Sequence, residues 1–143
     1  KAIPRLTIST FGGNPVSMVA AQATIDKMKT EDIPTRAARL GERLGAGLRA
    51  LQEKYPHNIG EVRGLGLMWG VEMVEDELAG DRSPNTELTG RVFEAGKTEE
   101  VLLGKGGRFG NVFRIAPPML ISEEEIDIGL ERFDRALSAG GAR

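Results

Sequence analysis

A run of hydroxyl and glycine residues near the start of the chain has the composition of an anion-binding turn. Residues 9–15 read Ser-Thr-Phe-Gly-Gly-Asn-Pro. The hydroxyl pair and the two permissive glycines can gather donors around an anion. Asn14 is a good helix N-cap and Pro15 a good first helical residue, so a helix is predicted to begin there. The same residues also suit a purely structural turn.

A second candidate for ligand chemistry is Arg114, in the segment Phe113-Arg-Ile-Ala-Pro-Pro118. A guanidinium on a rigid strand end can bind a carboxylate through two parallel hydrogen bonds, a geometry that lysine cannot reproduce. The prolines that follow stiffen the exit from the predicted strand and help to fix its direction. The alternative for Arg114 is an ion pair on the surface or between domains.

Three separated segments, in this order along the chain, resemble the C-terminal part of the class III pyridoxal-phosphate aminotransferases: Thr10–Pro15, Val62–Glu72 and Phe113–Pro118. The resemblance is strongest to members of the alanine–glyoxylate aminotransferase 2 type and extends from about Arg5 to Leu137. It implies a fold-type-I enzyme that works as a homodimer with pyridoxal 5'-phosphate. Its reaction would move an amino group between an alanine-like donor and a glyoxylate- or pyruvate-like 2-oxo acid.

The resemblance also implies site residues. The threonine at Thr10 would donate its hydroxyl to the phosphate of the cofactor bound by the other subunit, and Phe11 and Gly12, with Gly13, would shape the crossing loop. Arg114 would bind the substrate α-carboxylate.

No catalytic residue can be assigned, because the family's Schiff-base lysine precedes the Thr-Phe-Gly-Gly segment by some two dozen residues or more. Lys1 has the wrong spacing, and the other lysines match no cofactor motif: Lys27, Lys29, Lys54, Lys97 and Lys105. The chain is therefore expected to be a C-terminal portion that is inactive alone. The alternatives are a non-catalytic carboxylate-binding or dimerisation module, and an inactive remnant.

Composition narrows the class of protein without identifying it. The chain has 143 residues, 40% of them hydrophobic, and a net charge of −2. This length supports one proper core, and the near-neutral charge disfavours nucleic acid and anionic membranes as partners. The absence of cysteine excludes disulfides and thiolate sites, and the single histidine, His57, is interpreted as a loop residue. No apolar run approaches the ~20 residues of a membrane span, so a cytoplasmic protein is expected.

Hydrophobic periodicity predicts an α+β fold, with an antiparallel sheet that has helices on one face. Helices are expected at 15–29, 32–55, 86–97 and from Ser122 onward, and strands at 59–63, 67–74, 101–104 and 111–115. Residues 76–85 are interpreted as a polar loop and 105–110 as a hairpin loop rather than a phosphate cradle. The long helix shows a leucine stripe, and Ser122 with Glu125 forms a capping box.

Domain organisation follows from this order of elements and from the resemblance. Residues 1–31 are expected to end the large cofactor domain, and residues 32–143 to form the small C-terminal domain, with 32–55 as the linking helix. Trp69 is expected in the core and Glu72 on the opposite strand face, solvated or in an ion pair. Arg63 is expected to pair with an acid across the domain boundary, which the sequence does not identify.

Overall fold

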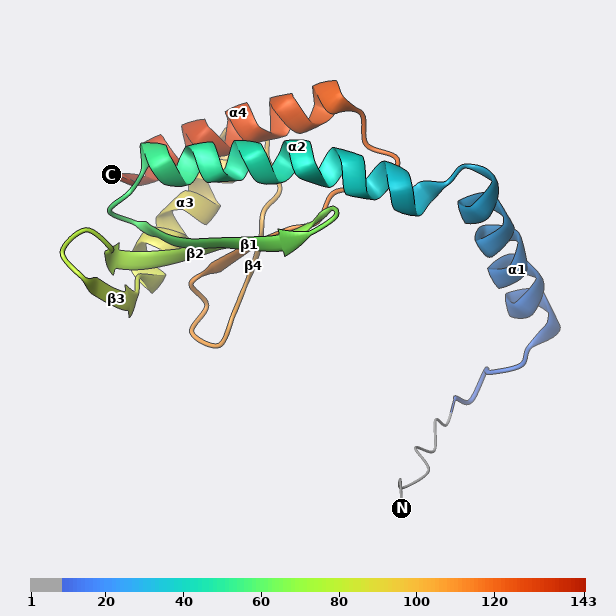
Figure 1. Ribbon diagram of the computed structural model, residues 1–143. Coiled ribbons are helices and arrows are strands. Elements are labelled where there is room, and N and C mark those ends of the chain that lie inside the picture. The colour runs from blue at the N-terminus through green and yellow to red at the C-terminus, as the bar shows by residue number, and fades with distance from the viewer. Residues whose placement is uncertain (1–8) are drawn as a thin grey trace, which may run out of the picture. The chain divides into compact units, whose positions relative to one another are not determined.

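The computed structural model describes residues 9–143, and the chain divides into two compact units, Lys1–Pro34 and Thr35–Arg143 (Figure 1). Lys1 and Arg5 lie outside the described residues. In the first unit, α1 (Pro15–Thr30) begins where the sequence predicted. The Asn14 side chain accepts hydrogen bonds from the backbone N–H groups of Val16 at 2.9 Å and Ser17 at 3.3 Å. No residue of α1 is buried.

The second unit contains a five-stranded antiparallel sheet. Its strands are β1 (Ile59–Leu65), β2 (Met68–Asp76), β3 (Asp81–Pro84), β4 (Gly104–Gly106) and β5 (Val112–Ile115). The order across the sheet is β1-β2-β5-β4, and the short β3 pairs with β2. The helices of this unit are α2 (Ile33–Lys54), α3 (Thr86–Thr98) and α4 (Glu123–Gly140), which confirms the predicted α+β class.

All three of these helices contribute to one core, which lies against one face of the sheet. Val71, Met73 and Phe113 point into it from the strands, and the ring of Phe113 meets that of Phe133 of α4 edge to face at 5.5 Å. The predicted stripe of α2 is confirmed, because Leu40, Leu44, Leu48 and Leu51 are all buried. Each buried leucine contributes about 1.5–3 kcal/mol of transfer free energy.

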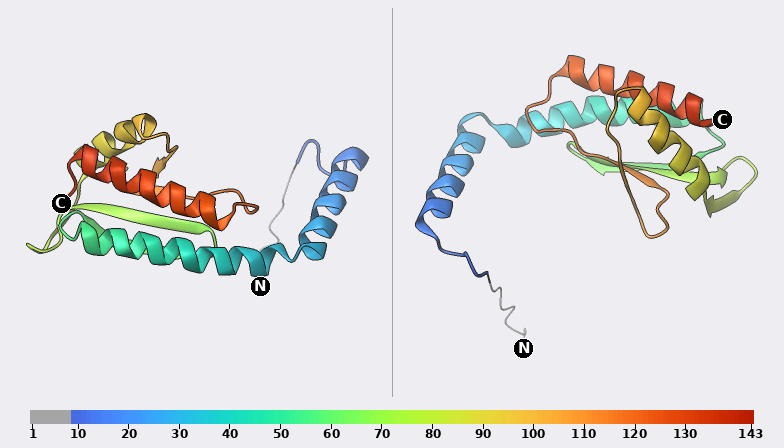
Figure 2. Two further views of the ribbon diagram at one scale, coloured as in Figure 1. Left: turned by 90° about the horizontal axis from the view of Figure 1, so that it is seen from above. Right: turned by 180° about the vertical axis from the view of Figure 1, so that it is seen from behind.

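Helices α2 and α4 run side by side in the same direction (Figure 2). Ion pairs join them at successive levels: Arg39 to Glu123, Arg43 to Asp127 at 2.6 Å, and Lys54 to Asp134 at 2.6 Å. The capping box that begins α4 is present, with both the Ser122 and Glu125 side chains bonded to the backbone of the other residue.

The glycines of α2 have a role that the sequence did not reveal. A Cβ atom on Gly41 would lie 2.1 Å from the carbonyl oxygen of Gly66, and one on Gly47 would lie 2.2 Å from Leu130 Cδ1. A Cβ atom at Gly45 would lie 2.2 Å from the indole of Trp69. These glycines, which a propensity scale counts only as a cost, let α2 approach the sheet and α4 closely.

Two sequence predictions need correction. Residues 76–85 are not all loop, because β3 pairs with β2 through Val74 with Pro84 and Asp76 with Asp81. The strand expected at 101–104 is shifted, because only Gly104–Gly106 pairs with β5. Helix α3 ends within one residue of its predicted end, although no glycine caps it: Glu100 itself adopts φ 58°, and the Val101 N–H bonds to the Gly96 carbonyl at 2.8 Å.

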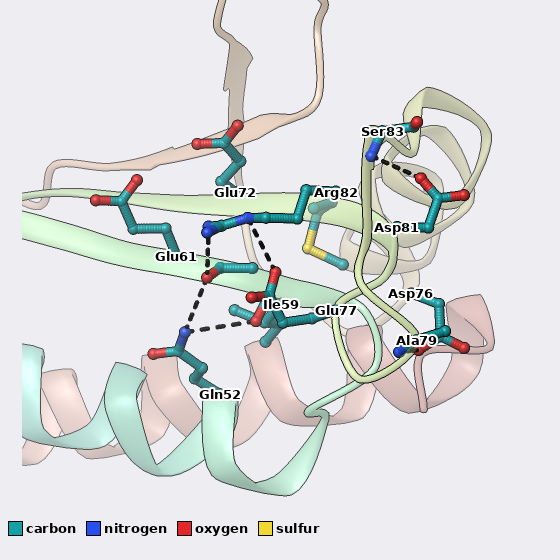
Figure 3. A network of polar contacts seen from close by, with 12 residues as sticks. Gln52, Ile59, Glu61, Glu72, Asp76, Glu77, Ala79, Asp81, Arg82 and Ser83 are labelled. Carbon is teal, nitrogen blue, oxygen red and sulfur yellow. Dashed lines mark hydrogen bonds and ion pairs between the residues drawn. The ribbon is translucent and has the colours of Figure 1, made fainter.

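A polar network connects α2 with β1 and β3 (Figure 3). Arg82 donates to the Gly60 carbonyl at 3.4 Å, and its Nε lies 3.2 Å from a carboxylate oxygen of Glu77. The Gln52 amide donates to the same Gly60 carbonyl at 3.3 Å. The register of β1 is irregular between Ile59 and Glu61, so Gly60 lies at a bulge where ladder pairing is interrupted. The Arg82 and Gln52 side chains thus supply hydrogen bonds to the Gly60 carbonyl.

His57 lies in the turn between α2 and β1, as predicted. Its Nδ1 lies 2.9 Å from Asp76 Oδ1, and its backbone N–H donates to the Arg143 carbonyl at 3.0 Å. The hydrogen bond with His57 is the largest of the effects that lower the pKa of Asp76. This arrangement ties the turn to β2 and to Arg143, which suits a structural residue.

Candidate functional site

Arg114 lies in β5 on the face of the sheet opposite the helices. Its neighbour Phe113 points into the core and is fully buried, so the alternation of the strand places Arg114 on the open face, where it is exposed. Its cross-strand partners are Gly70 on β2 and Gly104 on β4. Both partners lack a side chain, which leaves the guanidinium unobstructed on either side.

The guanidinium of Arg114 takes part in no hydrogen bond or ion pair within residues 9–143. Most other arginines of this part of the chain are engaged, for example Arg43 with Asp127 and Arg135 with Glu99. A guanidinium without a protein partner can bind a carboxylate by donating two parallel hydrogen bonds to it, the geometry that arginine favours.

Arg114 is among the lining residues of two hollows. The first, of about 310 Å³, lies on the open face of the sheet and is lined by Arg63, Met68, Trp69, Gly70, Gly106, Gly107, Val112 and Arg114. The second, of about 450 Å³, is largely apolar. It lies between the segments 101–104 and 114–118 and the helices α2 and α4.

Arg63 has its acid partners within the sheet, not across the domain boundary as predicted. Its Nη1 lies 2.7 Å from Glu61 Oε2 and 2.6 Å from Glu72 Oε2. The hydrogen bond with Glu72 is the largest of the effects that raise the pKa of Arg63. The predicted placement of Glu72 on the open strand face, in an ion pair, is confirmed. The alternation of side chains in residues 61–72 predicted which residues share the open face of the sheet. It did not predict which of them form ion pairs with Arg63.

Trp69 is a core residue, as predicted. Its indole is half-buried on the helix side of the sheet, and its Nε1–H donates to the Gly66 carbonyl at 2.7 Å. The guanidinium carbon of Arg49 lies 5.4 Å from its ring centroid, within cation–π range. Since its ring is held against Gly45, Trp69 anchors β2 to α2.

The residues predicted to contact a cofactor form one turn of the first unit, whereas Arg114 belongs to the second. Thr10, Phe11 and Gly12 are exposed, and the Gly12 N–H bonds to the Ser9 carbonyl at 3.2 Å. Gly13 adopts φ 76°, which favours glycine. Asn14 already caps the first N–H groups of α1, and the hydroxyl of Thr10 makes no hydrogen bond within the described residues.

The lysine side chains of residues 9–143 lie outside the two hollows that Arg114 lines. Lys27, Lys54 and Lys97 form surface ion pairs with Glu31, Asp134 and Glu94, respectively. Residues 9–143 also contain no group of three or more His, Asp or Glu side chains placed to hold a metal ion. None of their helices has the length and apolarity that a bilayer crossing requires.

Comparisons with known proteins agree with the geometry. The family model described as "Aminotransferase class-III" matches residues 4–137. The chain is 41% identical over 134 residues to alanine–glyoxylate aminotransferase 2 homolog 2 of Arabidopsis thaliana, and 40% identical over 121 residues to 5-aminovalerate aminotransferase of Pseudomonas putida. These alignments cover 94% and 85% of the chain, but only 28% of each relative.

Solved structures give the same result. A phospholyase from Arthrobacter in complex with phosphoethanolamine superimposes with a TM-score of 0.82 at 32% identity, over 94% of this chain and 31% of that one. An aminotransferase from Bacillus anthracis superimposes with a TM-score of 0.82 at 29% identity, over 94% and 30%. The sequence match, the fold and the order of the three motifs agree, and the chain belongs to the class III aminotransferase family.

Proposed function

We propose that this chain forms the C-terminal part of a pyridoxal-phosphate-dependent transaminase, in which Arg114 binds the carboxylate of the amino-acid or 2-oxo-acid substrate. The single observation that carries the proposal is the position of Arg114: a guanidinium without a partner in residues 9–143, between two glycines and lining the hollow on the open face of the sheet. Relatives named for alanine, glyoxylate and 5-aminovalerate all act on carboxylates. An arginine that binds this common group suits all of them.

The chain's own residues would orient rather than transform the substrate. Arg114 would fix one end of the molecule through two charge-assisted hydrogen bonds, which orients the rest of the substrate. Pyridoxal phosphate, when bound, would supply the electron sink that amino transfer needs. The exposed hydroxyl of Thr10 fits a single contact to its phosphate, made to the cofactor of the other protomer in a homodimer.

The test is Arg114→Ala in the complete transaminase that contains this chain. Hydrogen bonds to charged groups contribute about 1.5–3 kcal/mol each. Losing two of them should lower kcat/KM for amino acids by about 100-fold or more, while the melting temperature stays within a few degrees. Arg108→Ala, which removes another exposed arginine four residues beyond β4's Gly104, is the matched control and should change little. Unaltered kinetics for Arg114→Ala would refute the proposal.

The chain by itself should lack turnover. Mixed with pyridoxal phosphate and reduced with borohydride, it should show only scattered modification of surface lysines by mass spectrometry. Stoichiometric labelling of one lysine would contradict this expectation and would assign that lysine to the cofactor.

A further inference from the structure

The open face of the sheet places Arg114 within a small set of charged residues. Two cross-strand rows follow from the register of the strands: Arg63, Gly70, Arg114 and Gly104 in one, and Glu61, Glu72, Val112 and Gly106 in the other. The rows therefore hold two cations and two carboxylates. Both carboxylates contact Arg63, and neither contacts Arg114.

Glu72 is the carboxylate that could reach Arg114. It lies on β2, directly opposite Val112 of β5, which makes it a diagonal neighbour of Arg114. Diagonal neighbours in an antiparallel sheet lie roughly 7–8 Å apart, within reach of long side chains. Glu61 lies on β1 and is separated from β5 by the whole of β2.

Gly70 separates the two arginines in their row. The atoms nearest to a Cβ built there are Val112 Cγ1 at 3.4 Å and two atoms of Arg63 at 3.9 Å, which are ordinary contacts. The open space above Gly70 is part of the hollow that Arg63 and Arg114 both line. Gly70 itself puts no side chain between Glu72 and Arg114, and Glu72 is engaged by Arg63 on the β1 side of this glycine.

We propose that Arg63 is a positioning residue that keeps Arg114 available to a substrate carboxylate by holding Glu72 in an ion pair on the other side of Gly70. This inference rests on the proposed role of Arg114. Without Arg63, Glu72 would compete with the substrate as an intramolecular carboxylate. Exposed ion pairs of this kind contribute up to about 1 kcal/mol, which limits the effect on binding to roughly two- to five-fold.

The kinetic test uses the complete transaminase. Arg63→Met should raise KM for the amino-acid substrate about two- to five-fold and leave kcat nearly unchanged. The double variant Arg63→Met/Glu72→Gln should return KM to the original value, because the competing charge is gone. Arg63→Met/Glu61→Gln is the matched control: it removes the other carboxylate that Arg63 holds, on the strand remote from Arg114, and should leave KM raised. A purely structural role for Arg63 would give no such difference between the two double variants.

A second measurement separates this inference from the proposed function. In the 143-residue chain, the Nε–Hε signal of Arg114 in a nitrogen-15 spectrum should shift in Arg63→Met and return in Arg63→Met/Glu72→Gln. If Arg114→Ala impairs the enzyme but this signal does not respond to Arg63→Met, the positioning role of Arg63 is overturned alone. If the signal responds but Arg114→Ala leaves the kinetics intact, the carboxylate role of Arg114 is overturned, and the positioning role with it.

Discussion

The indole of Trp69 lies so close to the backbone of Gly45 that a Cβ atom on this glycine would fall 2.2 Å from Trp69 Cζ2. The helix α2 and the strand β2 are thus packed at a distance that only glycine permits. This contact fixes β2, and with it the cross-strand pairing of Gly70 and Arg114.

Gly45→Ala should destabilise the second unit. The added methyl group must displace the indole, and overpacking of this kind costs about 1–3 kcal/mol, more than alanine's helix-propensity gain of about 1 kcal/mol. Urea unfolding followed by tryptophan fluorescence measures the change. Gly90→Ala in α3 is the control, because a Cβ atom there meets nothing within 4 Å. It should be neutral or stabilising, and an equal loss in both variants would contradict the packing argument.

Glu100→Gly should stabilise the chain by about 0.5–1 kcal/mol. Glu100 adopts the left-handed conformation after α3, which costs a non-glycine residue about 1–2 kcal/mol, and the greater entropy of glycine in the unfolded chain offsets part of the gain. The measurement is the shift in melting temperature. Glu100→Ala, which removes the ion pair with Arg132 but keeps the left-handed strain, should not stabilise. A higher melting temperature for the alanine variant than for glycine would exclude strain as the cause.

Stability should fall on acidification below about pH 4. The hydrogen bond from Arg43 is the largest effect lowering the pKa of Asp127, and that from Arg39 lowers the pKa of Glu123. A carboxyl group with a lower pKa in the folded chain stabilises it above the unfolded pKa, and this stabilisation is lost as pH falls through the folded pKa. Melting temperatures between pH 7 and 3 test this. Asp127→Asn should reduce the fall of the melting temperature at low pH. An unchanged fall would argue against a contribution from the ion pairs between α2 and α4.

Thr10→Val should weaken cofactor retention in the complete transaminase. Valine keeps the shape of threonine but cannot donate a hydrogen bond to a phosphate, and a donor to a charged group contributes about 1.5–3 kcal/mol. Absorbance of bound pyridoxal phosphate after dialysis gives the retained fraction. Ser9→Ala removes the neighbouring hydroxyl and should retain the cofactor. Equal retention in the two variants would leave Thr10 with a structural role.

The 143-residue chain should bind apolar dyes and self-associate through α1. Val16 and Val19 are 78% and 71% exposed and lie on one side of the helix with Ala20 and Ala23. The double variant Val16→Gln/Val19→Gln should reduce dye binding and association, as followed by analytical ultracentrifugation. A monodisperse, cooperatively melting monomer that binds no dye would contradict this prediction.

Local patterns predicted the elements that depend on local chemistry. The leucine stripe of α2, the cap at Asn14 and the capping box at Ser122 are encoded within a few residues of themselves, and all three are present. The polar strand β3 has no such pattern, because it exists only by pairing with β2. Likewise, Glu100 adopts a glycine-like conformation because the contacts of the chain around it hold it there, which a propensity argument does not detect.

In the candidate site, too, only the features encoded by local sequence could be predicted. Arg114 could be identified from its own segment, whereas the arrangement around it depends on strand register. Arg63, Gly70 and Glu72 become its neighbours only when β1, β2 and β5 pair in one particular alignment. The partner of Arg63 was therefore not readable from the sequence, and the role of Glu72 relative to Arg114 was not foreseen.

The outer strands of the sheet bear on how this chain would aggregate. β1 is irregular at Gly60 and carries Glu61 and Arg63, while β4 has only three residues, two of them glycine. Bulged, charged or very short borders are poor templates for the addition of a foreign strand. Any aggregates that form in concentrated solution should therefore keep a helical circular dichroism spectrum. They should not increase thioflavin T fluorescence and should not convert into cross-β fibrils.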